Sequence, residues 1–130
     1  MEGMPIQKVQ AITGLSAHTL RYYEKAGLMI APVPRAANGH RRYTEEDVYW
    51  LRFLHRLRET GMPIADIRRY AELARQGEST VRDRLSLLET HRDAVRAHLQ
   101  QTTEYLDSIE RKIDHYHDYY GDQLAKARVA

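Results

Sequence analysis

The first hydrophobic positions of this 130-residue chain recur at helical spacing. Ile6, Val9 and Ile12 are three residues apart and predict one apolar stripe on a short helix. Pro5 suits its start, because the N–H that proline lacks is left unpaired in a first helical turn anyway. Gly14 suits its end, because glycine readily adopts the left-handed conformation there.

A second short helix is predicted to begin after Ser16, whose hydroxyl makes it a good N-cap. Leu20 and Tyr23 share its inward face, and Gly27 follows its end. Two short helices joined by a glycine turn within residues 6–27 are typical of a helix-turn-helix.

The polar side of this second helix carries Ala17, His18 and Arg21 near its N-terminal end. In a DNA-binding helix-turn-helix, residues at this place reach base edges, and an arginine pairs with guanine O6 and N7. An ordinary amphipathic helix with a solvated polar face is the alternative interpretation.

Residues 28–35 contain β-branched residues and two prolines, which favours an extended backbone. Asn38 and Gly39 then favour a tight turn with positive φ, and residues 40–43 predict the returning strand. The result is a small β-hairpin wing with three arginines near its tip and no neighbouring acid: Arg35, Arg41 and Arg42. Such a cluster suits phosphate contact, since each neutralised phosphate releases a counterion. A surface hairpin with ordinary charges is the alternative.

Two further helices are predicted between the wing and the long C-terminal segment. Thr44 caps the first, which ends at Gly61, and acids fill its first turn. Pro63 opens the second, and residues 76–78 break the chain after it. The predicted buried positions of the two helices are Val48, Leu51, Leu54, Leu57 or Arg58, Ile64, Ile67, Tyr70, Ala71 and Leu73.

Residues 80–120 contain no proline or glycine and predict one helix about 60 Å long. Its apolar residues alternate spacings of four and three, as in a coiled coil, with Arg92 and Thr102 as polar interruptions. This stripe predicts a two-fold dimer with a second copy. Folding back on residues 44–77 is the alternative. The predicted interface consists of Leu85, Leu88, Val95, Leu99, Leu106, Ile109 and Ile113, with Tyr116 and Tyr120 continuing the stripe.

The fold class that follows is mainly α: a winged helix-turn-helix head, then a long dimerisation helix. We expect a head at residues 5–77, the helix at 79–120 and a tail at 121–130. The net charge of +2 hides a basic segment, because residues 18–43 carry five basic side chains and one acid. Residues 61–130 carry 11 basic and 12 acidic ones. A polyanionic partner at one end of the molecule is indicated.

The chain has no cysteine, which excludes disulfides, thiolate metal sites and cysteine nucleophiles. It has no apolar run of the length a membrane span needs, and its start lacks the apolar core of a signal peptide. The sequence therefore predicts a soluble intracellular protein without a membrane association.

Four motifs together resemble the signature of the MerR (mercury-resistance-regulator) family. They are residues 19–24 (Thr-Leu-Arg-Tyr-Tyr-Glu), 27–28 (Gly-Leu), 38–44 (Asn-Gly-His-Arg-Arg-Tyr-Thr) and 61–64 (Gly-Met-Pro-Ile). The resemblance implies a bacterial cytoplasmic regulator, associated with the nucleoid when bound, that dimerises through an antiparallel coiled coil. It further implies a palindromic operator on double-stranded DNA. The −35 and −10 elements around that operator become readable to RNA polymerase when the DNA is distorted.

Carried over position by position, the resemblance directs Arg21 toward bases, Tyr22 toward a phosphate, and Arg41 and Tyr43 toward the wing's DNA contact. His40 departs from the tyrosine that the family usually has there, although histidine can also donate to a phosphate. The predicted DNA-binding set is Ser16, Ala17, His18, Thr19, Arg21, Tyr22, Arg35, Asn38, Gly39, His40, Arg41, Arg42 and Tyr43.

The sequence bears on the inducing signal mainly through the residues that the chain lacks. Residues 49–56 resemble the aldehyde- and stress-responsive branch, but Arg56 stands where that branch carries its reactive cysteine. Residues 121–130 are too few for a ligand-binding domain. The seven histidines form no clear cluster, so we expect no metal and no cofactor. Tyr49, Trp50, His55 and Tyr70 are candidates for a small effector pocket, or alternatively core and rim residues.

Two other functions remain as alternatives to a DNA-binding regulator. A head of this kind can bind a partner protein such as a chaperone instead of DNA, although the basic wing and complete recognition helix argue against it. An enzyme is the third possibility. The sequence shows no nucleophile–base pair, glycine-rich phosphate loop or metal-ligand spacing that favours it.

Overall fold

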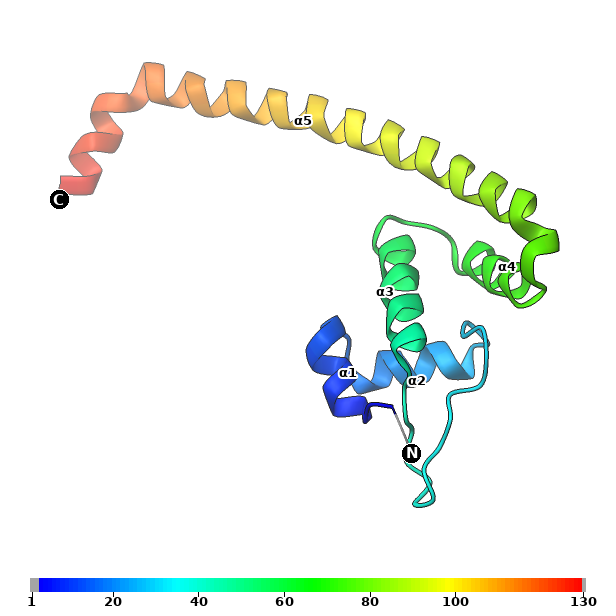
Figure 1. The fold of residues 1–130 in the computed structure, drawn as a ribbon. Helices are drawn as coiled ribbons and strands as arrows, with labels where there is room; N and C mark the ends of the chain where they lie inside the picture. The colour runs from blue at the N-terminus through cyan, green and yellow to red at the C-terminus, as the bar shows by residue number, and fades with distance from the viewer. Residues whose placement is uncertain (1–2, 130) are drawn as a thin grey trace. The chain divides into compact units, whose positions relative to one another are not determined.

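The structure is a computed structural model that describes residues 3–129, with side chains described to residue 126. It forms two units, Met1–His91 and Arg92–Ala130. The helices are α1 (Ile6–Thr13), α2 (Ala17–Lys25), α3 (Glu45–Glu59), α4 (Ile64–Arg75), the 3₁₀ turn η1 (Gly77–Thr80) and α5 (Val81–Val129) (Figure 1). We call the first unit the head. Helix α5 begins in the head, and its part after His91 forms the second unit. The prediction of a mainly helical chain is confirmed.

The ends of α1 and α2 are set by the residues that the sequence singles out. Gly14 lies at φ 74°, and its N–H donates to the Gln10 carbonyl at 2.8 Å. The Ser16 hydroxyl accepts from the Thr19 N–H at 3.1 Å, which pairs a donor that a helix start otherwise leaves free. Gly27 also has positive φ, and the Leu28 N–H after it donates back to Tyr23, as in a Schellman ending.

A reciprocal capping box opens α3. The Thr44 hydroxyl accepts from the Asp47 N–H at 3.1 Å, and the Asp47 carboxylate accepts from the Thr44 N–H at 2.9 Å. Three acids lie in this first turn, where the positive end of the helix dipole stabilises them. A cap of this kind contributes about 1 kcal/mol.

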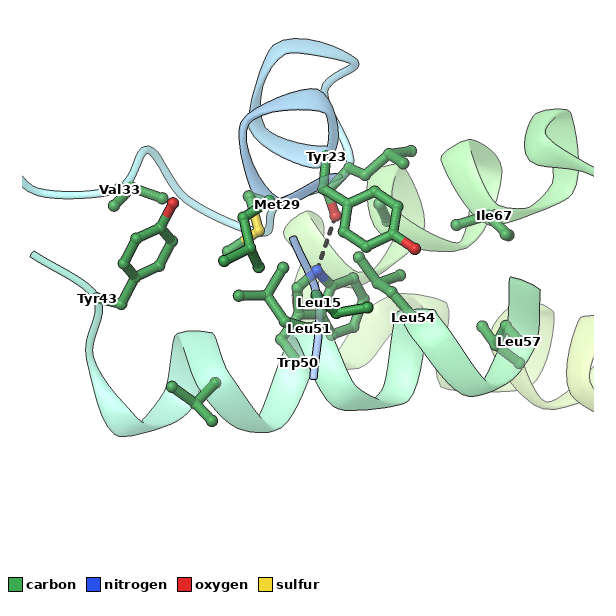
Figure 2. Packing of buried hydrophobic residues seen from close by; sticks show 14 of the residues in the cluster. Leu15, Tyr23, Met29, Val33, Tyr43, Trp50, Leu51, Leu54, Leu57 and Ile67 are labelled. Carbon is green, nitrogen blue, oxygen red and sulfur yellow. Dashed lines mark hydrogen bonds between the residues drawn. The ribbon is translucent and has the colours of Figure 1, made fainter. Parts of the chain in front are cut away.

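The described part of the head has one hydrophobic core, to which α1, α2, α3 and α4 all contribute; Figure 2 shows part of it. Trp50 joins two parts of this core: its indole N–H donates to the Leu28 carbonyl at 2.7 Å, and its ring stacks on Tyr70. Leu57, not Arg58, is the buried member of that pair. The prediction that Ile64 is buried is wrong: its side chain is 37% exposed, because it stands at the first residue of α4, at the edge of the core.

The wing differs from the prediction of two strands. Within residues 3–129 the loop carries only isolated bridges, Met4 with Tyr43 and Arg35 with Arg41. Pro34 has no N–H to donate, so it can only accept, at 2.8 Å from the Arg42 N–H. The predicted turn is confirmed at Gly39, whose φ is 82°. Among residues 3–129 no non-glycine residue has positive φ, so Asn38 does not share it.

The transition into α5 is fixed by Thr80, which is buried and whose hydroxyl donates to the Leu73 carbonyl at 2.5 Å. From there the helix runs past the predicted end at Tyr120 to Val129. Gly121 does not stop it, since one glycine inside a helix costs only about 1 kcal/mol.

Candidate nucleic-acid interface

The polar side of α2 is accessible, as a recognition helix requires. His18 and Arg21 are exposed, and Tyr22 keeps 40% of its surface in solvent. Ala17 and Thr19 are half-buried. Ser16 is engaged in the cap described above, and its hydroxyl also donates to the Thr19 hydroxyl at 3.0 Å. The base-reading candidates on this helix are therefore His18 and Arg21.

Arg58 joins this surface from α3, which the sequence did not indicate. Its guanidinium carbon lies 5.7 Å from the centre of the Tyr22 ring and 6.0 Å from that of Tyr23. A cation at this distance is attracted by the ring face and restrains the tyrosine.

Two of the three wing arginines, Arg35 and Arg41, have an acidic partner, whereas the sequence suggested that none has one. Glu24 of α2 accepts from Arg35 Nη2 at 3.3 Å through one carboxylate oxygen and from Arg41 Nε through the other. Arg35 Nη1 also donates to the Gly39 carbonyl at 3.2 Å. The prediction counted only neighbours in the sequence, and an acid from another element fills the place between the two arginines.

The tip of the wing is built by its own polar groups. The Asn38 side-chain oxygen accepts from the His40 N–H at 3.0 Å, and the His40 side chain stays exposed. The Gly39 carbonyl accepts from Arg35, as described above. These contacts shape the turn and leave the His40 ring available to a ligand.

Arg42 and Tyr43 fasten the wing to the N-terminal segment. Arg42 Nη2 donates to the Gly3 carbonyl at 2.8 Å, and Tyr43 exchanges two backbone hydrogen bonds with Met4. The Tyr43 ring is buried, and burial raises the pKa of its hydroxyl above the usual value. Its hydroxyl has no protein partner among the described residues. The structure thus places the Tyr43 ring in the core rather than on the exposed face of the wing.

Two arginines of α4 hold the segment between α2 and the wing. Arg75 donates to the carbonyls of Met29, at 2.8 and 3.0 Å, and of Gly27. Arg68 donates to the Ala26 carbonyl at 3.4 Å. These bonds join residues more than 40 positions apart, so no local pattern in the sequence indicates them.

The candidate effector residues do not come together. Trp50 and Tyr70 stack in the core, whereas Tyr49 is 77% exposed. His55 lies 3.9 Å from Glu59 on its own helix. Over the described residues, no three histidine, cysteine, aspartate or glutamate side chains are grouped as a metal site requires. No helix in the described part of the chain is long and apolar enough to cross a membrane.

The predicted dimer stripe on α5 is largely solvent-exposed. In the second unit Leu99, Leu106, Ile109 and Ile113 are each about half exposed or more, at 64, 50, 57 and 49%, and Val95 is half-buried. In the head, Leu85 is 53% exposed, while Leu88 packs against the hydrophobic core of its own chain.

Two family models match this architecture. The MerR HTH family regulatory protein model covers residues 4–74, and the MerR DNA-binding model covers residues 48–112. The chain belongs to the MerR family. A Haemophilus influenzae protein described as an uncharacterized HTH-type transcriptional regulator is 42% identical over 103 residues, which are 79% of this chain and 76% of the relative. AdhR of Bacillus subtilis is 42% identical over 89 residues, 68% of this chain and 63% of that regulator.

Solved structures of MerR regulators share the fold. A Listeria monocytogenes family member is 31% identical with a TM-score of 0.85 and covers 97% of this chain and 95% of its own. HiNmlR, described as a family regulator lacking the sensor domain and bound to promoter DNA, is 37% identical with a TM-score of 0.82 over 93% of this chain and 94% of its own. This chain is accordingly a MerR-family DNA-binding transcription regulator, and its relatives are regulators rather than enzymes.

Proposed function

We propose that this regulator binds a palindromic promoter operator as a homodimer and changes transcription by distorting the DNA between the −35 and −10 elements. The observation that carries the proposal is the contact between the predicted recognition helix and the wing, which meet through Glu24. Arg21 on α2 and Arg35 and Arg41 on the wing belong to two elements that Glu24 links directly. Recognition helix and wing then engage the same stretch of duplex.

Each part of this surface has a separate task in the proposal. Arg21 reads a guanine edge in the major groove, which gives sequence preference. His18, one turn before it, faces the neighbouring base pairs. Tyr22, restrained by Arg58, donates to a phosphate, and Arg41 neutralises another phosphate beside the wing. Phosphate contacts fix the position of the head on DNA, whereas the base contact supplies specificity.

The homodimer is supported by the exposed stripe of α5. A single helix with an apolar stripe of this length needs a partner surface, and a second copy supplies one of matching length. In a parallel pair every core residue faces the same residue of the second chain, so Arg92 would face Arg92 of that chain across the seam. An antiparallel pair avoids that repulsion, which agrees with the orientation that the family resemblance implies.

The charges beside the seam select one antiparallel register. When Leu99 faces Ile109 of the second copy, Arg92 faces Tyr116 and Arg96 lies beside Glu110, twice by symmetry. A shift of one heptad in one direction brings Glu89 beside Glu110, and a shift in the other brings Arg96 beside His117. The chosen register is therefore the one in which opposite charges meet.

Distortion of the operator follows from a dimer with two separated heads. Bending or untwisting a site of 20–30 base pairs costs of the order of 1–6 kcal/mol. Two heads, each with its own phosphate contacts, can offset that cost when the palindrome brings both onto the DNA. RNA polymerase then reads promoter elements whose spacing in relaxed DNA is unsuitable.

A mobility shift of the full chain on the DNA upstream of its own gene tests DNA recognition, at two salt concentrations and against a scrambled duplex. The proposal predicts a salt-sensitive shift that scrambled DNA does not compete away and that maps to a palindrome. Equal, weak binding to both duplexes would contradict it and favour a protein partner instead.

Cross-linking tests the register. Because the chain has no natural cysteine, each single-cysteine variant can be joined only through the cysteine that was introduced. In the proposed register Thr103 lies beside Thr103 of the second copy, so Thr103→Cys should be joined efficiently by a short bis-maleimide. Glu110→Cys is the matched control: it occupies the same heptad position, but its two copies lie about 20 Å apart. A dimer joined through position 110 and not through 103 would rule this register out.

A further inference from the structure

We propose that Glu24 is a positioning residue for DNA recognition, which holds both wing arginines at a fixed place relative to the recognition helix. This inference rests on the proposed function, because it assigns a role within the same DNA-binding surface. Glu24 has no obvious benefit there otherwise, since a carboxylate next to DNA is repelled by the phosphates.

The two oxygens of Glu24 bind the two legs of the wing separately. One accepts from Arg35, before the turn, and the other from Arg41, after it. The side chains of Glu24 and Arg41 are 21 and 23% exposed, so this pair is partly shielded from water, whereas Arg35 is 47% exposed. Partial burial strengthens such charge-assisted hydrogen bonds relative to those of an exposed pair.

The wing needs this carboxylate because its own backbone holds it weakly. Arg35 and Arg41 face each other in an isolated antiparallel bridge, and like charges directly opposite one another are destabilising. No regular strand supports the loop within the described residues, and Pro32 and Pro34 remove two donors. Glu24 therefore neutralises the repulsion at the point where the two legs meet.

The contact leaves Arg41 able to bind DNA. Glu24 engages its Nε, so the two terminal nitrogens keep their donors for a phosphate. Glu24 also lies on the same helix as Arg21, one turn further on. One helical turn thus sets the separation between the base-reading arginine and the phosphate-binding one, and this arrangement exists before DNA arrives, which lowers the ordering cost of binding.

The proposal predicts a sign opposite to that of simple electrostatics. If Glu24 only adds negative charge to the surface, Glu24→Gln should tighten binding to every duplex. If Glu24 positions the wing, the same change should weaken operator binding while binding to scrambled DNA stays equal or becomes tighter. The ratio of the two affinities separates the two roles, because a general loss of folded protein would lower both together.

The test measures operator and scrambled-duplex affinities of the full-length wild type, Glu24→Gln and Glu24→Asp. Glu72→Gln is the matched control, because it makes the same charge change at an exposed residue of α4. We expect Glu24→Gln to lose about tenfold in operator affinity, the loss of one charge-assisted hydrogen bond. Glu24→Asp should recover part of that loss, and Glu72→Gln should lose none.

Arginine side-chain NMR of the DNA-free protein provides a second readout. The Arg41 Nε–H signal should be shifted and protected from exchange in the wild type, and should move to the position of a solvated arginine in Glu24→Gln. An unchanged signal, or operator affinity that stays equal or rises in Glu24→Gln, would overturn the inference. Failure of the wild type itself to discriminate operator from scrambled DNA would instead refute the proposed function.

Discussion

The head and the second unit treat apolar side chains in opposite ways. In the head, Val9, Leu28, Leu51 and Ala71 are fully enclosed by other elements of the same chain. Between residues 92 and 126 no side chain is buried, although the apolar stripe continues throughout. The head encloses its own core, whereas the second unit leaves its apolar stripe exposed.

The difference matters because most of the stability of a helix in water comes from the packing of its apolar face, not from its intrinsic propensity. We therefore expect the head to fold as a unit of its own. In the proposed homodimer the second unit gains comparable packing by pairing, and the predictions below separate these two sources of stability.

The largest effect is expected from Leu99→Glu. This change places a carboxylate in the seam of both copies and removes about 2 kcal/mol of apolar burial from each, about 4 kcal/mol per dimer. Sedimentation velocity should show monomers at concentrations where the wild type is dimeric. Gln101→Glu introduces the same charge off the seam and should leave the dimer intact; a dimeric Leu99→Glu protein would mean that the interface lies elsewhere.

Leu51→Ala is the corresponding change in the head. Leu51 is fully buried, so its truncation should lower the free energy of unfolding of the head by about 3 kcal/mol through lost burial and a residual cavity. Denaturant unfolding followed by Trp50 fluorescence measures this. Dimerisation in native buffer should be unaffected, and a loss of both together would show that head and coil do not behave as separate units.

Arg21→Ala should weaken operator binding by about 2 kcal/mol and relax the preference at one position of each half-site, because a bidentate guanine contact is lost. Quantitative mobility shifts on single-base variants of the operator detect both effects. A loss of the same size on scrambled DNA would show that Arg21 contacts phosphate and not a base.

The smallest effect is expected from Arg41→Ala, which should weaken binding to all duplexes alike. It should reduce the magnitude of the slope of log affinity against log salt concentration by about 0.9, which is the contribution of one phosphate contact. Affinity titrations at several salt concentrations give the slope. Arg69→Ala on α4 serves as the control, and an unchanged slope in Arg41→Ala would remove the wing from the phosphate contacts.

Local features of the fold follow from the sequence because their causes are local. Ser16 and Thr44 cap helices through bonds to residues three positions away, and the spacing of Leu20, Tyr23, Leu51 and Leu54 places them in the core. These contacts depend only on helical geometry.

The contacts that shape the proposed DNA-binding surface could not be predicted in this way. Glu24 meets Arg35 and Arg41, Arg58 meets Tyr22, and Arg75 meets Met29, all between residues that are distant in the sequence. They form only once the core has placed the elements, so neither periodicity nor local composition indicates them. The strands of the wing were predicted from residue type, and the prolines that suggested extended backbone also remove ladder hydrogen bonds.

The most direct test of the account is the stoichiometry and affinity of the full chain on a complete palindrome compared with a half palindrome of equal length, measured by sedimentation equilibrium. Two heads joined by one coil should bind the complete site as two chains per duplex. Because the second head binds at high effective concentration, affinity should exceed that for the half site by about a hundredfold or more. One chain per duplex, or equal affinity for both sites, would contradict the central claim that a homodimer reads the operator.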